Sequence, residues 1–119
     1  MLEHLPASIP KSLRLIAYAS EPMPAQLITA LLERMPNVQF VQFYGMIEHL
    51  CLTVMRPSEQ LTKMGTVGHP MIGAELKILD ADSDTTGDDM NGEIIARTPT
   101  LFGGYSQDPS ATSQVMQEG

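Results

Sequence analysis

Apolar and polar positions in the first sixty residues follow two different periods. Residues 13–18 and 38–44 are short, mostly apolar or β-branched runs bounded by Pro, Gly and other turn formers, which is typical of strands in a parallel sheet. Between them, five apolar residues recur at helical spacing and mark one face of an amphipathic helix: Leu27, Ile28, Leu31, Leu32 and Met35. The pattern therefore predicts a strand, a crossover helix and a parallel strand, which together form a βαβ unit.

Short antiparallel strands are predicted for much of the remaining chain. Residues 50–55 form a further apolar run, and residues 74–79 alternate in polarity as a half-buried strand does. Residues 93–97 are the expected hairpin partner across the acidic loop 80–92, and this pairing suggests a small β-barrel or a curved sheet. Asp108-Pro109 then opens a short helix, with the acidic residue as its N-cap.

Together these patterns predict an α/β fold in two parts. Residues 1–60 form the strand–helix–strand piece, and residues 61–119, which hold nine of the 14 acidic side chains, form a small β-barrel piece that ends in an incomplete helix. A βαβ unit by itself leaves the edges of its sheet without partners. We therefore expect the chain to be part of a larger sheet or, if it stands alone, to form a homodimer through those strand edges.

Composition and charge argue against several classes of protein. The net charge is −7, which disfavours nucleic acid and anionic membrane surfaces as partners. No apolar run approaches the length of about 18 residues that a membrane-spanning helix needs, so no transmembrane segment is expected. The single cysteine, Cys51, cannot form an internal disulfide, which fits a cytoplasmic location, and we expect its thiol to be buried.

The best candidate site lies where the two parallel strands end. Ligands of open α/β sheets bind beyond the carboxyl ends of the strands, here the turn 19–22 and residues 44–49, which should lie side by side. In the second segment, the Tyr44 ring and the Glu48 carboxylate are suited to hold a ligand and a metal ion. On the residues alone, a Tyr44 that caps the core and a solvated Glu48 fit the pattern equally well.

The acidic loop offers a rival metal site. Three of its acidic residues are spaced like the opening of a calcium-binding loop: Asp80, Asp82 and Asp84. The sixth position of such a loop needs Gly and is Thr85 here, and the twelfth needs an acidic residue and is Asn91. We therefore interpret this segment as a solvated hairpin loop that turns at Asn91-Gly92.

Five segments along the chain together carry a family resemblance. They are, in order, YASEPMP at 18–24, QFYGMIE at 42–48, GTVGHP at 65–70, GEIIAR at 92–97 and GGYSQDPSAT at 103–112. In these segments and their spacing, the chain resembles an internal segment of an AMP-forming acyl-CoA synthetase. These enzymes belong to the adenylate-forming superfamily, with luciferases and peptide-synthetase adenylation domains. The resemblance implies that both parts belong to a larger N-terminal adenylation domain.

The resemblance implies a nucleotide site at the first two segments. The turn formed by Ser20, Glu21 and Pro22 would lie against the adenine of ATP, and Tyr44 would stack on the other face of the ring. Ile47 would lie beside the α-phosphate, where the family usually has a Thr whose hydroxyl bonds that phosphate. Because Ile cannot donate a hydrogen bond, one phosphate contact would be missing.

The same resemblance assigns the remaining positions of the second segment. Gln42 and Phe43 would run towards the carboxylate substrate, and Gly45 and Met46 would border the acyl-adenylate. Glu48 would hold Mg²⁺ beside the phosphates, where the ion neutralises developing charge. No catalytic set is complete within the chain.

The implied activity is that of an AMP-forming acid–thiol ligase, an enzyme of the kind found in fatty acid metabolism. Such an enzyme joins a carboxylate to ATP to give acyl-AMP and pyrophosphate, and coenzyme A then displaces AMP. The implied cofactors are ATP, Mg²⁺ and coenzyme A, and the implied partner is a small carboxylate.

Two hypotheses follow for the chain itself. In the first it is an internal fragment of such a ligase, expected to be inactive alone because the family's phosphate loop, ribose-binding Asp and catalytic Lys lie outside these 119 residues. In the second it is a stand-alone, non-catalytic binding or interaction module derived from such an enzyme. Ile47 favours the second hypothesis, whereas the unpartnered strand edges and the incomplete last helix favour the first.

Overall fold

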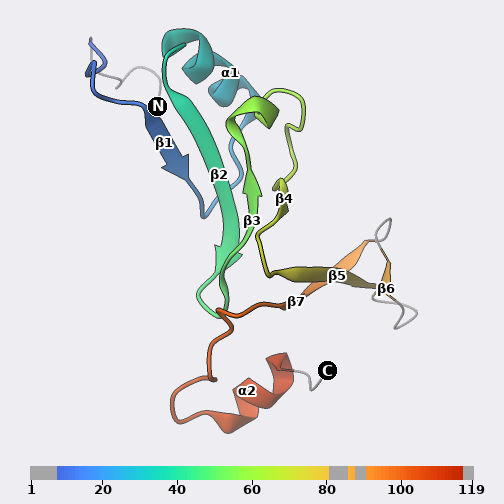
Figure 1. Cartoon of the computed structure of the whole chain (residues 1–119). Coiled ribbons are helices and arrows are strands. Elements are labelled where there is room, and N and C mark those ends of the chain that lie inside the picture. The colour runs from blue at the N-terminus through green and yellow to red at the C-terminus, as the bar shows by residue number, and fades with distance from the viewer. Residues whose placement is uncertain (1–7, 81–85, 88–90, 117–119) are drawn as a thin grey trace.

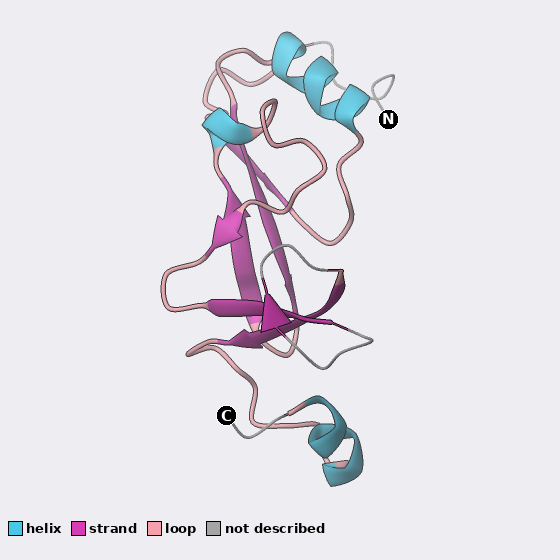
Figure 2. Ribbon diagram, turned by 90° about the vertical axis from the view of Figure 1, so that its right-hand side faces the viewer, coloured by secondary structure: helices cyan, strands magenta, loops and turns pink. Residues whose placement is uncertain are grey.

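The fold combines a mixed four-stranded sheet with a three-stranded antiparallel sheet (Figure 1). The computed structural model describes residues 8–80, 86–87 and 91–116. The elements, in chain order, are β1 (Leu15–Tyr18), α1 (Ala25–Arg34), β2 (Gln39–Met46), β3 (Leu50–Met55), the 3-10 helix η2 (Pro57–Glu59), β4 (His69–Pro70), β5 (Glu75–Asp80), β6 (Thr86–Gly87), β7 (Gly92–Arg97) and α2 (Pro109–Val115). Figure 2 shows α1 and α2 at opposite ends of the molecule, with the strands between them.

The first sheet confirms the predicted βαβ unit. β1 pairs with β2 in parallel, from Leu15 opposite Gln39 to Tyr18 opposite Gln42, and α1 connects the two strands. β3 then runs antiparallel to β2, and the two-residue strand β4 adds to the far side of β3. β4 lies after residue 60, yet it belongs to this sheet; the division into 1–60 and 61–119 stays a prediction.

Helix α1 covers one face of this sheet and makes the main core with it. Four apolar side chains are buried together there, and they come from α1, the turn that follows it and the start of β2: Ile28, Met35, Val38 and Phe40. Leu31 and Leu32 pack against this cluster, so the apolar stripe predicted for the helix faces the sheet. Burying each such side chain contributes about 1.5–3 kcal/mol to folding, and this core therefore holds α1 against the start of β2.

The second sheet confirms the predicted hairpin but not a closed barrel. β5 pairs antiparallel with β7, from Glu75 opposite Arg97 to Asp80 opposite Gly92, and β6 adds two residues on its other side. Among the described residues this sheet is open, with the strand order β6-β5-β7. Asp82, Asp84 and Thr85 of the rejected calcium pattern lie outside the described residues.

Gly92 corrects the expected turn at Asn91-Gly92. Gly92 is the first residue of β7, and a Cβ built on it would lie 1.9 Å from the carbonyl oxygen of Leu79 on β5. Glycine is therefore needed for the close approach of two strands, not for a hairpin turn.

Cys51 is exposed, which corrects the expectation of a buried thiol. It is the second residue of β3, at the hairpin end of the strand, and burial on this strand begins only at Leu52.

The predicted helix opening is confirmed, because the Asp108 side chain accepts a 2.9 Å hydrogen bond from the Ala111 N–H at the start of α2. No helix in the described part of the chain is long and apolar enough to cross a membrane.

Candidate functional site

The turn after β1 leaves the first sheet before β2 ends, because β2 continues for four residues past its last pair with β1. β1 ends at Tyr18, opposite Gln42, so the turn that contains Ser20 leaves the sheet beside the last four residues of β2 (Figure 1). Ser20 has a φ of 79°, a left-handed conformation that is uncommon for a residue other than glycine. Ser20, Glu21 and Pro22 are all exposed, so this turn presents its backbone and side chains to the surface.

Gln42 is held in the interior by a hydrogen-bonded group. The Tyr18 hydroxyl lies 3.1 Å from the Gln42 amide oxygen and 2.7 Å from that of Gln60. Gln60 is 2% exposed, and its amide nitrogen donates to the Met55 carbonyl oxygen at 3.3 Å. Burial raises the pKa of Tyr18, so this hydroxyl stays protonated and fixes β1 to β2 just before the site. Sequence reasoning missed Gln60, because nothing in its neighbourhood marks a polar core residue.

Gly45 lies where the backbones of β2 and β3 approach each other closely. The pairing shifts between Tyr44 and Gly45, which marks a β-bulge. A Cβ built on Gly45 would lie 1.7 Å from the carbonyl oxygen of Leu50, and Leu50 itself has a φ of 57°. The hairpin's own backbone therefore requires glycine here, whether or not a ligand also approaches.

The turn between β2 and β3 presents three of the predicted site residues. Met46 is 53% exposed and Ile47 is 90% exposed, so both apolar side chains extend to the surface. Glu48 follows, and the Tyr105 hydroxyl donates a 2.5 Å hydrogen bond to its carboxylate oxygen Oε1. Tyr44 and Phe43, near the end of β2, are half-buried.

A segment distant in sequence holds the turn in place. The Phe102 N–H donates to the Glu48 carbonyl oxygen at 2.7 Å, and the Thr100 hydroxyl donates to the His49 carbonyl oxygen at 2.7 Å. The rings of Phe102 and Tyr105 meet edge to face, with centroids 5.0 Å apart. Three hydrogen bonds therefore join residues 100–105 to the turn. Tyr105 lies within the fifth segment of the resemblance, but the sequence alone predicts no role for it.

The electrostatics of the turn keep Glu48 ionised. The hydrogen bond from Tyr105 is the main cause that lowers the pKa of Glu48, with smaller contributions from its own backbone N–H and from His49. The same bond raises the pKa of Tyr105, because a neighbouring carboxylate disfavours the phenolate. Glu48 therefore offers a charged oxygen ligand near neutral pH.

Glu48 would need ligands from elsewhere to hold a metal. Within residues 8–80, 86–87 and 91–116, no group of three or more His, Cys, Asp or Glu side chains is placed to bind a metal ion. Mg²⁺ usually keeps several waters and is bound through one or two carboxylates plus substrate phosphates. A single ionised carboxylate that shares the ion with substrate phosphates is compatible with that mode, so Glu48 fits Mg²⁺.

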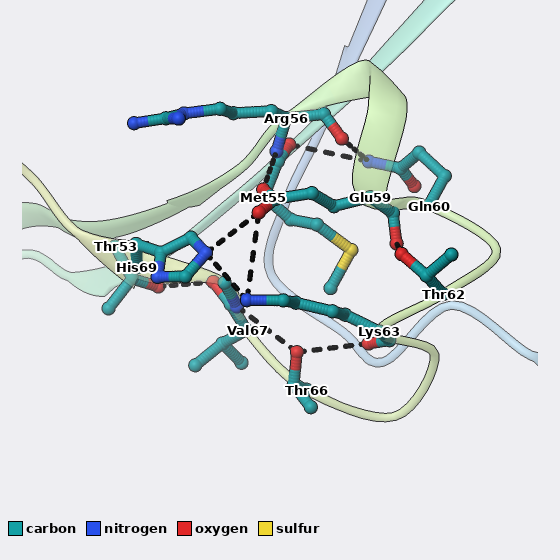
Figure 3. A network of polar contacts seen from close by, with 11 residues as sticks. Thr53, Met55, Arg56, Glu59, Gln60, Thr62, Lys63, Thr66, Val67 and His69 are labelled. Atoms are coloured by element: carbon teal, nitrogen blue, oxygen red, sulfur yellow. Dashed lines mark hydrogen bonds and ion pairs between the residues drawn. The ribbon is translucent and has the colours of Figure 1, made fainter.

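A second polar cluster joins β4, which contains His69 of the third segment, to η2 and the loop that follows it (Figure 3). The His69 Nε2 atom lies 2.7 Å from Glu59 Oε1 and 2.7 Å from Lys63 Nζ, and it can donate to the first or accept from the second, but not both at once. The Arg56 N–H is the main cause that lowers the pKa of Glu59, followed by His69. These contacts make His69 structural.

The chain matches a known family over most of its length. The family model described as "AMP-binding enzyme" matches residues 1–106. Among similar proteins, 4-coumarate–CoA ligase 3 of Oryza sativa subsp. japonica is 34% identical over 113 residues, which cover 90% of this chain and 20% of that protein. The 2-succinylbenzoate–CoA ligase of Geobacillus kaustophilus (strain HTA426) is 33% identical over 114 residues, which cover 95% of this chain and 23% of that one.

Solved structures show the same likeness. The o-succinylbenzoate CoA synthetase of Bacillus subtilis, in complex with its acyl-adenylate intermediate, has a TM-score of 0.82 and 27% identity. That match covers 99% of this chain and 24% of the synthetase. The same enzyme with ATP and a magnesium ion has a TM-score of 0.81. The chain therefore spans about a quarter or less of the length of these relatives.

Proposed function

The chain belongs to the AMP-binding enzyme family, and from this premise we propose that it forms part of an AMP-forming ligase that joins a carboxylate to coenzyme A. The names of its relatives support this proposal, since they include ligases for 4-coumarate and 2-succinylbenzoate. In the proposed reaction, ATP and the carboxylate give acyl-AMP and pyrophosphate, and coenzyme A then displaces AMP. The carboxylate of this chain's parent is a small organic acid whose class the experiment below identifies.

The observation that carries the proposal is the position and charge of Glu48. It follows the carboxyl end of β2, the edge of the sheet where ligands of open α/β sheets bind, and it is kept ionised by Tyr105. The Ser20–Pro22 turn leaves the neighbouring strand at the same edge. An exposed backbone turn, the Tyr44 ring and a carboxylate are groups suited to an adenine ring and a magnesium phosphate.

Each residue has a defined part in this proposal. The Ser20–Pro22 turn and the Tyr44 ring bind the adenine, and Gln42 and Phe43 lead towards the carboxylate. Glu48 binds Mg²⁺, which when present neutralises charge on the phosphates. The turn orients this carboxylate through its bonds to residues 100–105.

The proposed activity is tested on the protein at its native length, meaning the polypeptide that carries this chain in its source cells. An antibody against residues 8–80 identifies that polypeptide on a blot. The purified protein is then assayed for ATP–pyrophosphate exchange with aromatic acids, succinylbenzoate and fatty acids of several lengths. We expect exchange that depends on one class of carboxylate and on Mg²⁺.

Glu48→Gln is the sharpest variant of this test, because it keeps the shape of the side chain and removes its charge. We expect it to lower exchange sharply, by about tenfold or more, as loss of a metal ligand should. Glu33→Gln on the exposed face of α1 is the matched control and should leave exchange unchanged. Unchanged exchange in the Glu48 variant would contradict its metal role.

A second candidate function is a non-catalytic binding or interaction module, and the observation that favours it is Ile47. Its side chain is 90% exposed on the turn and carries no hydroxyl, where the family usually has Thr. A folded protein that binds nucleotide but shows no exchange with any carboxylate would support this second function over the first.

A further inference from the structure

We propose that Tyr105 is a positioning residue for Glu48: its hydroxyl holds the carboxylate in the orientation in which that side chain binds a divalent metal. The inference rests on the metal role proposed above for Glu48. It concerns a contact between residues that are 57 positions apart in the sequence and are joined by a 2.5 Å hydrogen bond.

The position of Glu48 on its turn makes such support necessary. The two residues before Glu48, Met46 and Ile47, are exposed, and the Glu48–Tyr105 hydrogen bond itself lies at the surface. A glutamate has three side-chain torsions, and ordering them costs free energy when a metal binds. A hydrogen bond that is already formed in the free protein removes part of that cost, as outer-shell partners of metal ligands do.

Tyr105 is itself held from two sides. Its ring meets the edge of Phe102, whose N–H donates to the Glu48 carbonyl oxygen. Its backbone N–H donates to the Thr112 hydroxyl at 2.9 Å, and that hydroxyl in turn donates to the Asp108 carbonyl oxygen at 2.9 Å. The first turn of α2 therefore anchors Tyr105, and Tyr105 anchors the carboxylate.

This arrangement gives α2 an indirect part in the site, because the start of the helix anchors Tyr105. Figure 1 shows α2 beyond the β2–β3 turn, joined to it by the chain that follows β7. The connection runs from the start of α2 through the Tyr105 phenol to the Glu48 carboxylate, and these hydrogen bonds involve neither Ser20 nor Glu21. Loss of the phenol should therefore affect metal binding and leave adenine binding unchanged.

The test measures metal binding directly, on the protein at its native length. Mn²⁺ is titrated against the protein with a non-hydrolysable ATP analogue present, and free Mn²⁺ is followed by electron paramagnetic resonance. Exchange activity is measured in parallel as a function of Mg²⁺ concentration. The variants are Tyr105→Phe, Glu48→Gln and the double variant. Ser113→Ala is the matched control, because it removes a hydroxyl hydrogen bond within α2 that does not involve the β2–β3 turn.

Tyr105→Phe keeps the ring contact with Phe102 and removes only the hydroxyl, so the fold is retained. We expect Mn²⁺ affinity to fall about tenfold, the lower end for loss of an outer-shell partner, with the Mg²⁺ needed for half-maximal exchange rising to match. The exchange rate at saturating Mg²⁺ should stay close to that of the unaltered protein. The double variant should bind Mn²⁺ no more weakly than Glu48→Gln alone, because both changes act on one contact.

Three results would overturn the inference, and they are distinguishable from one another. If Glu48→Gln weakens Mn²⁺ binding and Tyr105→Phe does not, the positioning role is wrong and the proposed function stands. If Tyr105→Phe lowers the exchange rate at saturating Mg²⁺ without changing metal affinity, its role is structural. If Glu48→Gln leaves Mn²⁺ affinity unchanged, the metal role of Glu48 fails and the inference fails with it.

Discussion

Replacing Gly45 with Ala tests whether the β2–β3 hairpin or a ligand requires glycine at this position. The added Cβ would lie 1.7 Å from the Leu50 carbonyl oxygen and 2.7 Å from the Leu50 carbonyl carbon. Both atoms belong to backbone, so no side-chain rotation relieves the contact. The hairpin must open at this end, and the turn that carries Glu48 must move with it.

The size of the effect follows from the pairs that have to separate. Gly45 is paired with Cys51, and Met46 with Leu50, at the end of the ladder. Losing about two backbone hydrogen bonds costs roughly 1 kcal/mol each, and overpacking adds about 1–3 kcal/mol. The substitution should therefore cost about 3–5 kcal/mol, a large part of the roughly 5–15 kcal/mol by which a domain is stable.

Hydrogen exchange of the protein at its native length measures this loss locally. A loss of about 3 kcal/mol corresponds to roughly hundredfold faster exchange of the affected amides. The amides to follow are those of residues 50–55, in β3. Mass spectrometry of peptides from β3 and from β5 in the same sample separates a local opening of the hairpin from unfolding of the whole domain.

Gly103→Ala is the matched control for Gly45→Ala. A Cβ on Gly103 meets nothing within 4 Å, and its backbone is not in the left-handed region. Amide hydrogen exchange of the Gly103→Ala variant should be unchanged or slightly slower, because Ala restricts the unfolded chain. If the amide hydrogens of both variants exchange as fast as those of the unaltered protein, the close approach of β2 and β3 does not require Gly45. A ligand would then be the remaining reason for glycine at this position.

Two further predictions concern single side chains. Ile47→Thr should raise pyrophosphate exchange by roughly five- to hundredfold, since a hydroxyl bonded to a phosphate contributes about 1–3 kcal/mol. Ile47 is 90% exposed, so the free energy of unfolding should change by no more than about 0.5 kcal/mol. Ile47→Val is the control and should not raise the rate of pyrophosphate exchange. Equal rates in the Thr and Val variants would show that the missing hydroxyl does not limit the reaction. The pKa of Glu59 is lowered from its usual 4.5, mainly by the hydrogen bond from the Arg56 N–H and then by His69. The ionised Glu59 side chain therefore contributes its full stabilisation above about pH 4.5, and this stabilisation is lost as the pH falls through the lowered pKa. Protection of the amides of residues 56–70 from hydrogen exchange, corrected for intrinsic rates, should drop in acid in the unaltered protein and much less in Glu59→Gln. The same dependence of protection on pH in both proteins would contradict this prediction.

Local periodicity was sufficient to predict most of the elements. The apolar stripe from Leu27 to Met35 faces the sheet because helical spacing places these residues on one side of any helix. The N-cap at Asp108 forms within four residues of chain, and the β5–β7 hairpin pairs two neighbouring segments. β1 and β2 also lie side by side and run in the same direction as expected, since parallel pairing follows from the connection between them.

Only the tertiary structure determined which residues support these elements. Tyr18 bonds Gln60 from 42 positions away, and Tyr105 bonds Glu48 from 57 positions away. Such pairs depend on how separate elements pack, and a polar side chain looks the same in sequence whether it is solvated or aimed at a distant partner. The exposure of Cys51 has the same origin, because a strand's apolar pattern does not say where along its length the covering layer ends. The sequence by itself therefore determined most of the elements, through interactions between near neighbours along the chain, whereas only the packing decided how the Glu48 carboxylate is held.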